Sequence, residues 1–204
     1  MTLTAQTLLA ELDTTLSEVS QDWRSGVLRQ IADLFLGDAE HYSKDQVALF
    51  DAVIGLLLHG ADELTLAELS SRLAGVPNAP AKVLASLANH PDLEVCGPVL
   101  ERSKALPDEV IVEVADRERI EHSILAKIAA RAQLGEMVTD SLLKRGNPAL
   151  QRTILENPNA RVSENGFARV IMSLDGDKNL AQIVAARQDL PAELRPWLND
   201  ILKS

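Results

Sequence analysis

Histidine and cysteine are the residues of this chain best suited to catalysis or metal binding, and their spacing gives none of them an obvious partner. His59 lies close in sequence to Asp62 and Glu63, a combination that could bind a metal ion. The three residues lie on either side of Gly60, however, which is predicted to end a helix, and no second histidine is near. We therefore interpret this cluster as a capped, solvated helix end. Structural or surface roles are predicted for the other histidines, His41, His90 and His122.

The single cysteine, Cys96, has no second thiol with which to form a disulfide or complete a zinc or redox motif. Ile124 occupies the equivalent position in the next unit of a repeat described below, so Cys96 is predicted to be a small, buried apolar residue. The alternative, a nucleophile, would require a nearby base. No glycine-rich phosphate loop, carboxylate pair or Ser/His/Asp triad can be assembled. We therefore predict that the protein is not an enzyme and has no catalytic residue, metal site or cofactor.

Arginine is the charged residue type whose spacing along the chain is more regular than chance would give. Arg117 and Arg145 are separated by one period of the repeat, which is about 28 residues, and Arg131 and Arg187 are separated by two periods. In a stack of helices with this period, equivalent positions line up as basic ladders that could meet carboxylates or phosphates. The alternative is that an arginine at a helix C-terminus satisfies main-chain carbonyls and the helix dipole. The candidate partner-binding residues are Arg102, Lys104, Arg117, Arg131, Arg145 and Arg187.

The repeat itself must position these side chains. One set of regularly spaced apolar residues is Leu106, Leu134, Val162 and Leu190, and a second set with the same interval is Val114, Leu142, Val170 and Leu198. Each unit holds two short amphipathic helices, and such units stack because neighbours bury one another's apolar faces. The sequence therefore predicts an all-α fold, an α-solenoid of stacked two-helix repeats.

Amphipathic helices are also predicted before the repeat. Apolar residues at intervals of three and four predict helices over Leu3–Val19, Trp23–Phe35 and Val47–Leu57. Acidic residues are concentrated in this part of the chain. We therefore predict an acidic helical subdomain at residues 1–64, which caps the stack, and helical repeats of about 28 residues at residues 65–204.

Three local patterns refine the helix boundaries. Ser43 with Gln46, and Thr65 with Glu68, have the spacing of capping boxes, in which each residue satisfies the other's main-chain amide. Gly166 interrupts the apolar pattern of its repeat unit. We expect two capped helix starts and one locally irregular helix.

Composition and charge limit the class of protein and partner. Hydrophobic residues make up 46% and charged residues 25% of the 204-residue chain, which is typical of a folded soluble protein. The net charge of −10 argues against nucleic acid or anionic membrane as the main partner, because both favour clustered Lys and Arg. The apolar stretch Val53–Leu58 is far shorter than the roughly 20 residues of a membrane span, and residues 1–10 lack the features of a signal peptide. A cytoplasmic protein is expected.

Several short motifs resemble a known bacterial family. They are Val99-Leu100-Glu101-Arg102-Ser103, Leu106-Pro107-Asp108-Glu109, Val138-Thr139-Asp140-Ser141-Leu142, and Asn157-Pro158-Asn159-Ala160 with Phe167. Together with Arg29–Phe35 and Gln46–Leu57, they are similar to the HEAT-like helical repeats of a family known as domain of unknown function 2336. The resemblance covers most of the chain and implies a HEAT-like α-solenoid in an alphaproteobacterial type of cytoplasm. It implies no site residues, because the family has no assigned activity.

A helical solenoid offers a long curved surface and little enclosed volume, which favours binding over sheltering a reaction. The sequence therefore predicts a non-enzymatic scaffold or adaptor that binds another protein through the surface of the second helices. Two alternatives stay open: a helical-repeat protein that binds nucleic acid in a basic groove, and a small-molecule hydrolase with a pocket between the N-terminal helices and the repeats. The N-terminal helices are also a candidate surface for formation of a homo-oligomer.

Overall fold

The computed structural model describes residues 19–203, and all regular secondary structure within this range is helical. It comprises twelve α-helices and one short 3-10 helix, with no β-strand among the described residues. The predicted all-α class is thus confirmed. The helix predicted over Leu3–Val19 lies outside the described residues, except for its last residue. The chain divides into two compact units, the first ending at Pro107 and the second beginning at Asp108, and the domain boundary expected at residue 64 stays a prediction.

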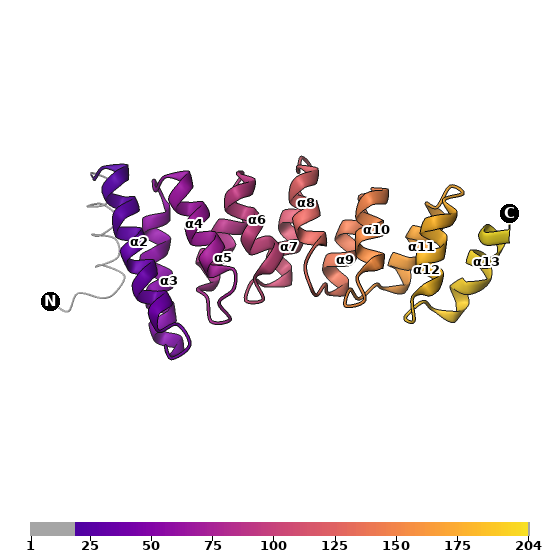
Figure 1. Ribbon diagram of the computed structural model, residues 1–204, viewed down its shortest axis with the longest axis horizontal. Helices are drawn as coiled ribbons and strands as arrows, with labels where there is room; N and C mark the ends of the chain where they lie inside the picture. Colours follow the sequence, from indigo (N-terminus) through magenta and orange to yellow (C-terminus); the bar gives the residue numbers. More distant parts are fainter. Residues whose placement is uncertain (1–18, 204) are drawn as a thin grey trace. The chain divides into compact units, whose positions relative to one another are not determined.

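The first unit has five described helices (Figure 1). They are α2 (Gln21–Gly37), α3 (Lys44–Leu58), α4 (Glu63–Leu73), α5 (Ala81–Ala88) and α6 (Leu93–Arg102). Helix α2 packs against α3 and α4, α4 packs against α6, and α5 contacts α3, α4 and α6. Their apolar stripes meet in a core that includes Leu28, Ile54 and Leu73, each completely buried. Cys96 is also buried, as the sequence predicts.

Two helix starts in the first unit test the predicted capping boxes. The Ser43 and Gln46 box is confirmed, with each side chain accepting a hydrogen bond from the other residue's main-chain amide. The box predicted for Thr65 and Glu68 is wrong. Helix α4 begins at Glu63, three residues earlier than this box requires, because the Asp62 carboxylate accepts from both the amide and the hydroxyl of Thr65, at 2.8 and 2.7 Å.

The second unit has seven α-helices and the 3-10 helix among its described residues. They are α7 (Asp108–Ala115), α8 (His122–Ala129), α9 (Glu136–Leu143), α10 (Pro148–Glu156), α11 (Glu164–Met172), α12 (Lys178–Ala186), the 3-10 helix (Ala192–Leu194) and α13 (Arg195–Lys203). Helices α7, α9 and α11 pack side by side, and α8, α10 and α12 do the same, so these six helices form two layers (Figure 1). The loops that follow α8, α10 and α12 each bury an apolar residue, Leu134, Val162 and Leu190 respectively.

Helix α11 runs without interruption through Gly166, so the predicted local irregularity is wrong. The glycine has a packing role instead. A Cβ atom at this position would lie 2.9 Å from Oδ1 of Asp140 on α9 and 3.2 Å from a methyl group of Leu143. The absence of a side chain therefore lets α11 approach α9 closely.

Candidate functional site

Arg187 follows α12 and is almost entirely enclosed, with 7% of its side chain exposed. Its guanidinium donates to the carbonyl oxygens of Leu155, Asn157 and Ala160, at 3.1, 2.9 and 2.6 Å. The remaining N–H groups donate to the Asp189 carboxylate, both at 2.8 Å. All five N–H donors of the guanidinium are thus used within the second unit. The carbonyls lie at or beyond the end of α10, where helix carbonyls lack partners.

Arg145 and Arg131 lie in similar surroundings. The guanidinium of Arg145 donates to the carbonyls of Ala115, at the end of α7, and of Arg117, the latter at 2.6 Å. Arg131 is 9% exposed, and burial lowers the pKa of its guanidinium while the charge of Asp108 opposes that shift. Arginine remains charged after such a shift, so Arg131 is a buried cation, whereas Arg145 is a half-buried cation held by main-chain carbonyls.

The six predicted partner-binding residues do not form one cluster within either unit. Arg102 and Lys104 belong to the first unit, where Arg102 donates to the carbonyl and hydroxyl oxygens of Ser71 on α4 and Lys104 is exposed. The other four belong to the second unit, where Arg117 is half-buried. The bonds of Arg145 and Arg187 agree with the helix-capping alternative. Partner binding by these six residues stays a prediction.

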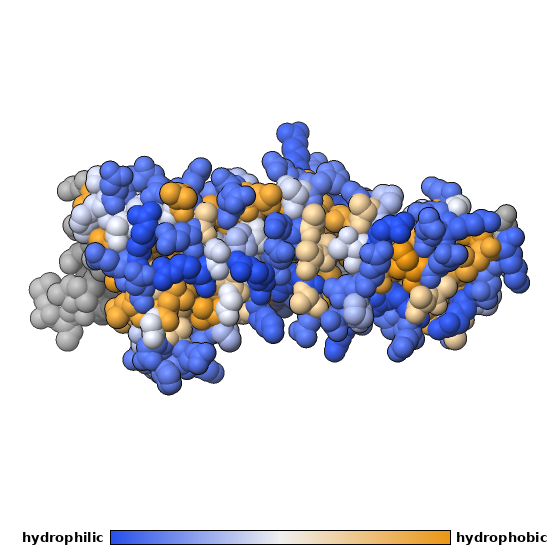
Figure 2. Space-filling view, in the orientation of Figure 1, coloured by the Kyte–Doolittle hydropathy of each residue, from blue (hydrophilic) through white to orange (hydrophobic). Residues whose placement is uncertain are grey.

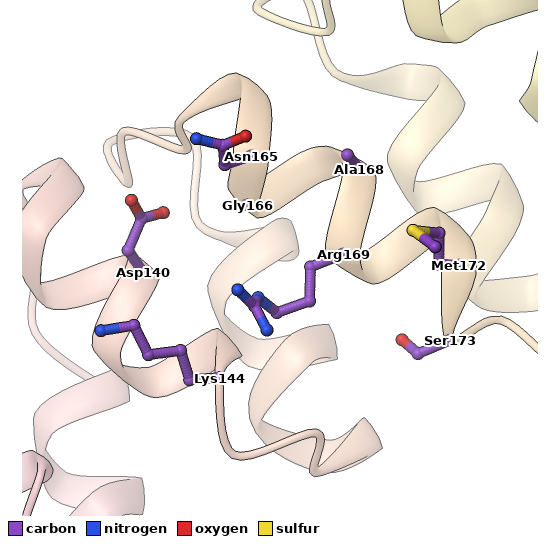
Figure 3. Close-up of a pocket in the computed structure, with 8 residues that line it drawn as sticks. All are labelled: Asp140, Lys144, Asn165, Gly166, Ala168, Arg169, Met172 and Ser173. Atoms are coloured by element: carbon purple, nitrogen blue, oxygen red, sulfur yellow. The ribbon is translucent and has the colours of Figure 1, made fainter.

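A groove with a volume of about 610 Å³ lies between α9 and α11 in the second unit (Figure 3). It is lined by Asp140, Lys144, Asn165, Gly166, Ala168, Arg169, Met172 and Ser173. These positions recur at intervals of three and four on each helix, so they share the faces on either side of the groove. The groove is open to solvent, and 78% of Met172 is exposed.

Asp140 is held in place at the junction of the two helices. Its Oδ1 accepts a hydrogen bond from the hydroxyl of Ser163, the N-cap of α11, at 2.7 Å. The same hydroxyl oxygen accepts from the amide of Gly166 at 2.9 Å. This chain of bonds, together with the bare Cα of Gly166, fixes how α11 meets α9 at one end of the groove.

Two cations line the groove. Lys144 and Arg169 are both exposed, and neither side chain forms a hydrogen bond or ion pair with another residue in the range 19–203. Figure 3 shows Arg169 reaching from α11 toward α9. An exposed guanidinium and an ammonium on adjacent helices can both bind carboxylate oxygens, and the thioether of Met172 adds apolar surface that adapts to a partner's shape.

The regular spacing of residues in the sequence does not predict this groove. Lys144 is the neighbour of Arg145, whose regular spacing made it a candidate. Arg169 has no basic residue one period before it, because Ser141 occupies the equivalent position in the preceding repeat unit. The one available signal was Gly166, whose interruption of the apolar pattern marks the close approach of two helices. As for metals, the described part of the chain holds no group of three or more His, Cys, Asp or Glu residues that could bind an ion.

Comparisons with known proteins place the chain in a family. A family model described as an uncharacterised protein conserved in bacteria, domain of unknown function 2336, matches residues 95–203. This match covers more than half of the 204 residues, and the chain belongs to that family. No match was found among curated proteins or among solved structures. None of the described helices is long and apolar enough to cross a membrane.

Proposed function

We propose that this member of the domain of unknown function 2336 family is a non-enzymatic scaffold or adaptor that binds another protein. Its helices would form a HEAT-like α-solenoid of two-helix repeats, and the second helices, α7, α9 and α11, would provide the binding surface. We further propose a cytoplasmic location. Self-association through the acidic N-terminal helices stays a prediction.

The observation that carries this proposal is the groove between α9 and α11. It combines unpaired cations with an exposed apolar side chain, since Met172 on α11 is 78% exposed. A flexible, exposed methionine beside unpaired cations suits a surface that another protein can cover. In the space-filling view, the visible face of the second unit likewise shows apolar surface between hydrophilic side chains (Figure 2).

The openness of the groove supports binding over catalysis. A reaction site gains most of its electrostatic advantage by excluding water, whereas this groove leaves Lys144, Arg169 and Met172 exposed. Protein recognition tolerates such exposure, because a partner covers the surface on binding and supplies the missing contacts.

Affinity capture from the native host, followed by mass spectrometry, tests this proposal. The wild-type chain should capture a specific protein, and Met172→Glu should lose it, because a charge replaces the apolar contact. Leu64→Glu in α4 is the matched control, since Leu64 is equally exposed at 75% but lies in the first unit. The proposal fails if no protein is captured above background, or if both variants capture it as well as the wild type.

A further inference from the structure

Lys144 and Arg169 share one groove and have no carboxylate partner among the described residues, unlike three exposed or half-buried arginines elsewhere in the chain. Arg29 pairs with Glu68 at 3.3 Å, Arg72 pairs with Asp33 at 2.6 Å, and Arg152 lies 3.7 Å from Asp177. With 30 acidic against 20 basic side chains, the chain has ample carboxylates for such pairs. Two adjacent helices nevertheless present Lys144 and Arg169 without an internal counter-ion among the described residues.

The nearest internal candidate is Asp140, which lies one helical turn before Lys144. Carboxylate and ammonium groups at this spacing commonly pair on a helix surface, yet these two described side chains form no ion pair with each other. Asp140 instead accepts from Ser163 and lies against Gly166 at the junction of the helices. The ammonium of Lys144 therefore keeps its donors available to an incoming group.

Apolar surface continues the groove from the cations along α11. Ala168 precedes Arg169 and is half-buried, and Met172, one turn beyond Ala168, is largely exposed. Asn165 offers an amide that can both donate to and accept from a main chain. The groove thus provides a place for an anion, a place for an apolar side chain and a polar contact for a peptide backbone.

We infer that this groove recognises an acidic protein segment, with a Glu or Asp carboxylate bound by Lys144 and Arg169 and an apolar side chain resting on Ala168 and Met172. This inference rests on the proposed function and adds the chemistry of the partner. A nucleic acid fits less well, because its continuous phosphate charge would also meet the fixed carboxylate of Asp140 and the exposed Glu164 at the start of α11.

Fluorescence anisotropy with the full chain tests the inference. Three labelled peptides share the same Leu and Ala positions and carry Glu, Lys or Gln at the remaining positions. The Glu peptide should bind most tightly, and Lys144→Glu with Arg169→Glu should weaken it about tenfold or more while strengthening the Lys peptide. The control is Lys44→Glu with Lys82→Glu, which reverses two exposed cations of the first unit and should leave all three affinities unchanged.

Equal affinity for the three peptides, or a Glu peptide that is insensitive to the groove reversal, would overturn the inference. So would a single-stranded oligonucleotide that binds more tightly than the Glu peptide and depends on the same two cations. The inference and the proposed function fail separately: if Met172→Glu loses the captured host protein but the charge reversal keeps it, the proposed function stands and recognition through carboxylates is overturned. Circular dichroism of each variant confirms that it is folded.

Discussion

Two neighbouring residues at the C-terminal end of α9 carry the same charge in opposite surroundings. Arg145 is half-buried, and its guanidinium donates to the carbonyls of Ala115 and Arg117. The side chain of Lys144 is exposed on the groove and has no partner among the described residues. A cation near a helix end therefore has a structural role when it reaches the unpaired carbonyls of a neighbouring helix or loop. It is available to a ligand when its side chain extends into solvent instead.

Arg187 and Arg169 repeat this contrast with one residue type. Arg187 uses every N–H donor of its guanidinium on groups within the second unit, whereas the side chain of Arg169 has no hydrogen-bond partner in residues 19–203. Because the two side chains are chemically identical, replacing one should affect mainly the stability of the protein, and replacing the other should affect mainly its binding to a partner. Stability should depend on Arg187, and partner binding should depend on Arg169.

The largest expected effect is the loss of stability on replacing Arg187 with Ala. The substitution removes a nearly buried side chain and leaves the carbonyls of Leu155, Asn157 and Ala160 without this donor, which should cost about 3 kcal/mol in the free energy of unfolding. Urea denaturation measures the loss. Arg169→Ala is the matched control and should change stability by less than about 0.5 kcal/mol, because Arg169 is exposed. Equal losses for the two variants would remove the distinction.

A smaller effect is expected at Gly166, whose bare Cα sets the approach of α11 to α9. Gly166→Ala should destabilise the protein by about 1 kcal/mol, because the new methyl group would lie 2.9 Å from the anchored Asp140 carboxylate. In α3, Gly55 has nothing within 4 Å of the corresponding position, so Gly55→Ala should stabilise by about 0.5–1 kcal/mol. Thermal unfolding of the two variants should therefore shift in opposite directions. A shift of the same sign would show that close packing does not explain Gly166.

The smallest effect concerns a carboxylate that is used within the fold, Asp62. Hydrogen bonds from the Ser25 hydroxyl and from the hydroxyl and amide of Thr65 lower the pKa of Asp62 to about 2 from its ordinary value of 3.8. Its contribution to stability is therefore complete above about pH 4 and is lost as the pH falls through about 2. The advantage of the wild type over Asp62→Asn, measured by urea denaturation, should shrink across this range. An advantage that does not change with pH would contradict the assignment.

Much of the fold follows from local patterns in the sequence. Apolar spacing predicted the all-α class, and local capping chemistry predicted the helix start at Ser43. The capping box predicted at Thr65 is wrong because the carboxylate of Asp62, three residues earlier, accepts the hydrogen bond from the Thr65 amide. The interrupted apolar pattern at Gly166 predicts a local irregularity, whereas its cause is a contact with α9 that only the tertiary structure reveals.

The candidate site was much less predictable, because it depends on which groups lie within reach of each charged side chain in the folded protein. Their regular spacing and positive charge made Arg145 and Arg187 candidates for partner binding. Spacing alone cannot show that carbonyls of neighbouring elements lie within reach of their guanidinium groups. Lys144 and Arg169 belong to different helices and to different positions of the predicted repeat. Their common groove emerges only when α9 and α11 pack side by side.

Site-specific photo-crosslinking in the native host tests the central claim most directly. A photo-reactive amino acid in place of Met172 should crosslink to one specific protein, because this position lies on the groove and is exposed. The same amino acid in place of Glu118, an exposed residue of the second unit that is not part of the groove lining, should give no such product. Crosslinking from Met172 alone is the predicted result. Equal products from both positions, or none from Met172, would contradict the claim that the groove binds a partner protein.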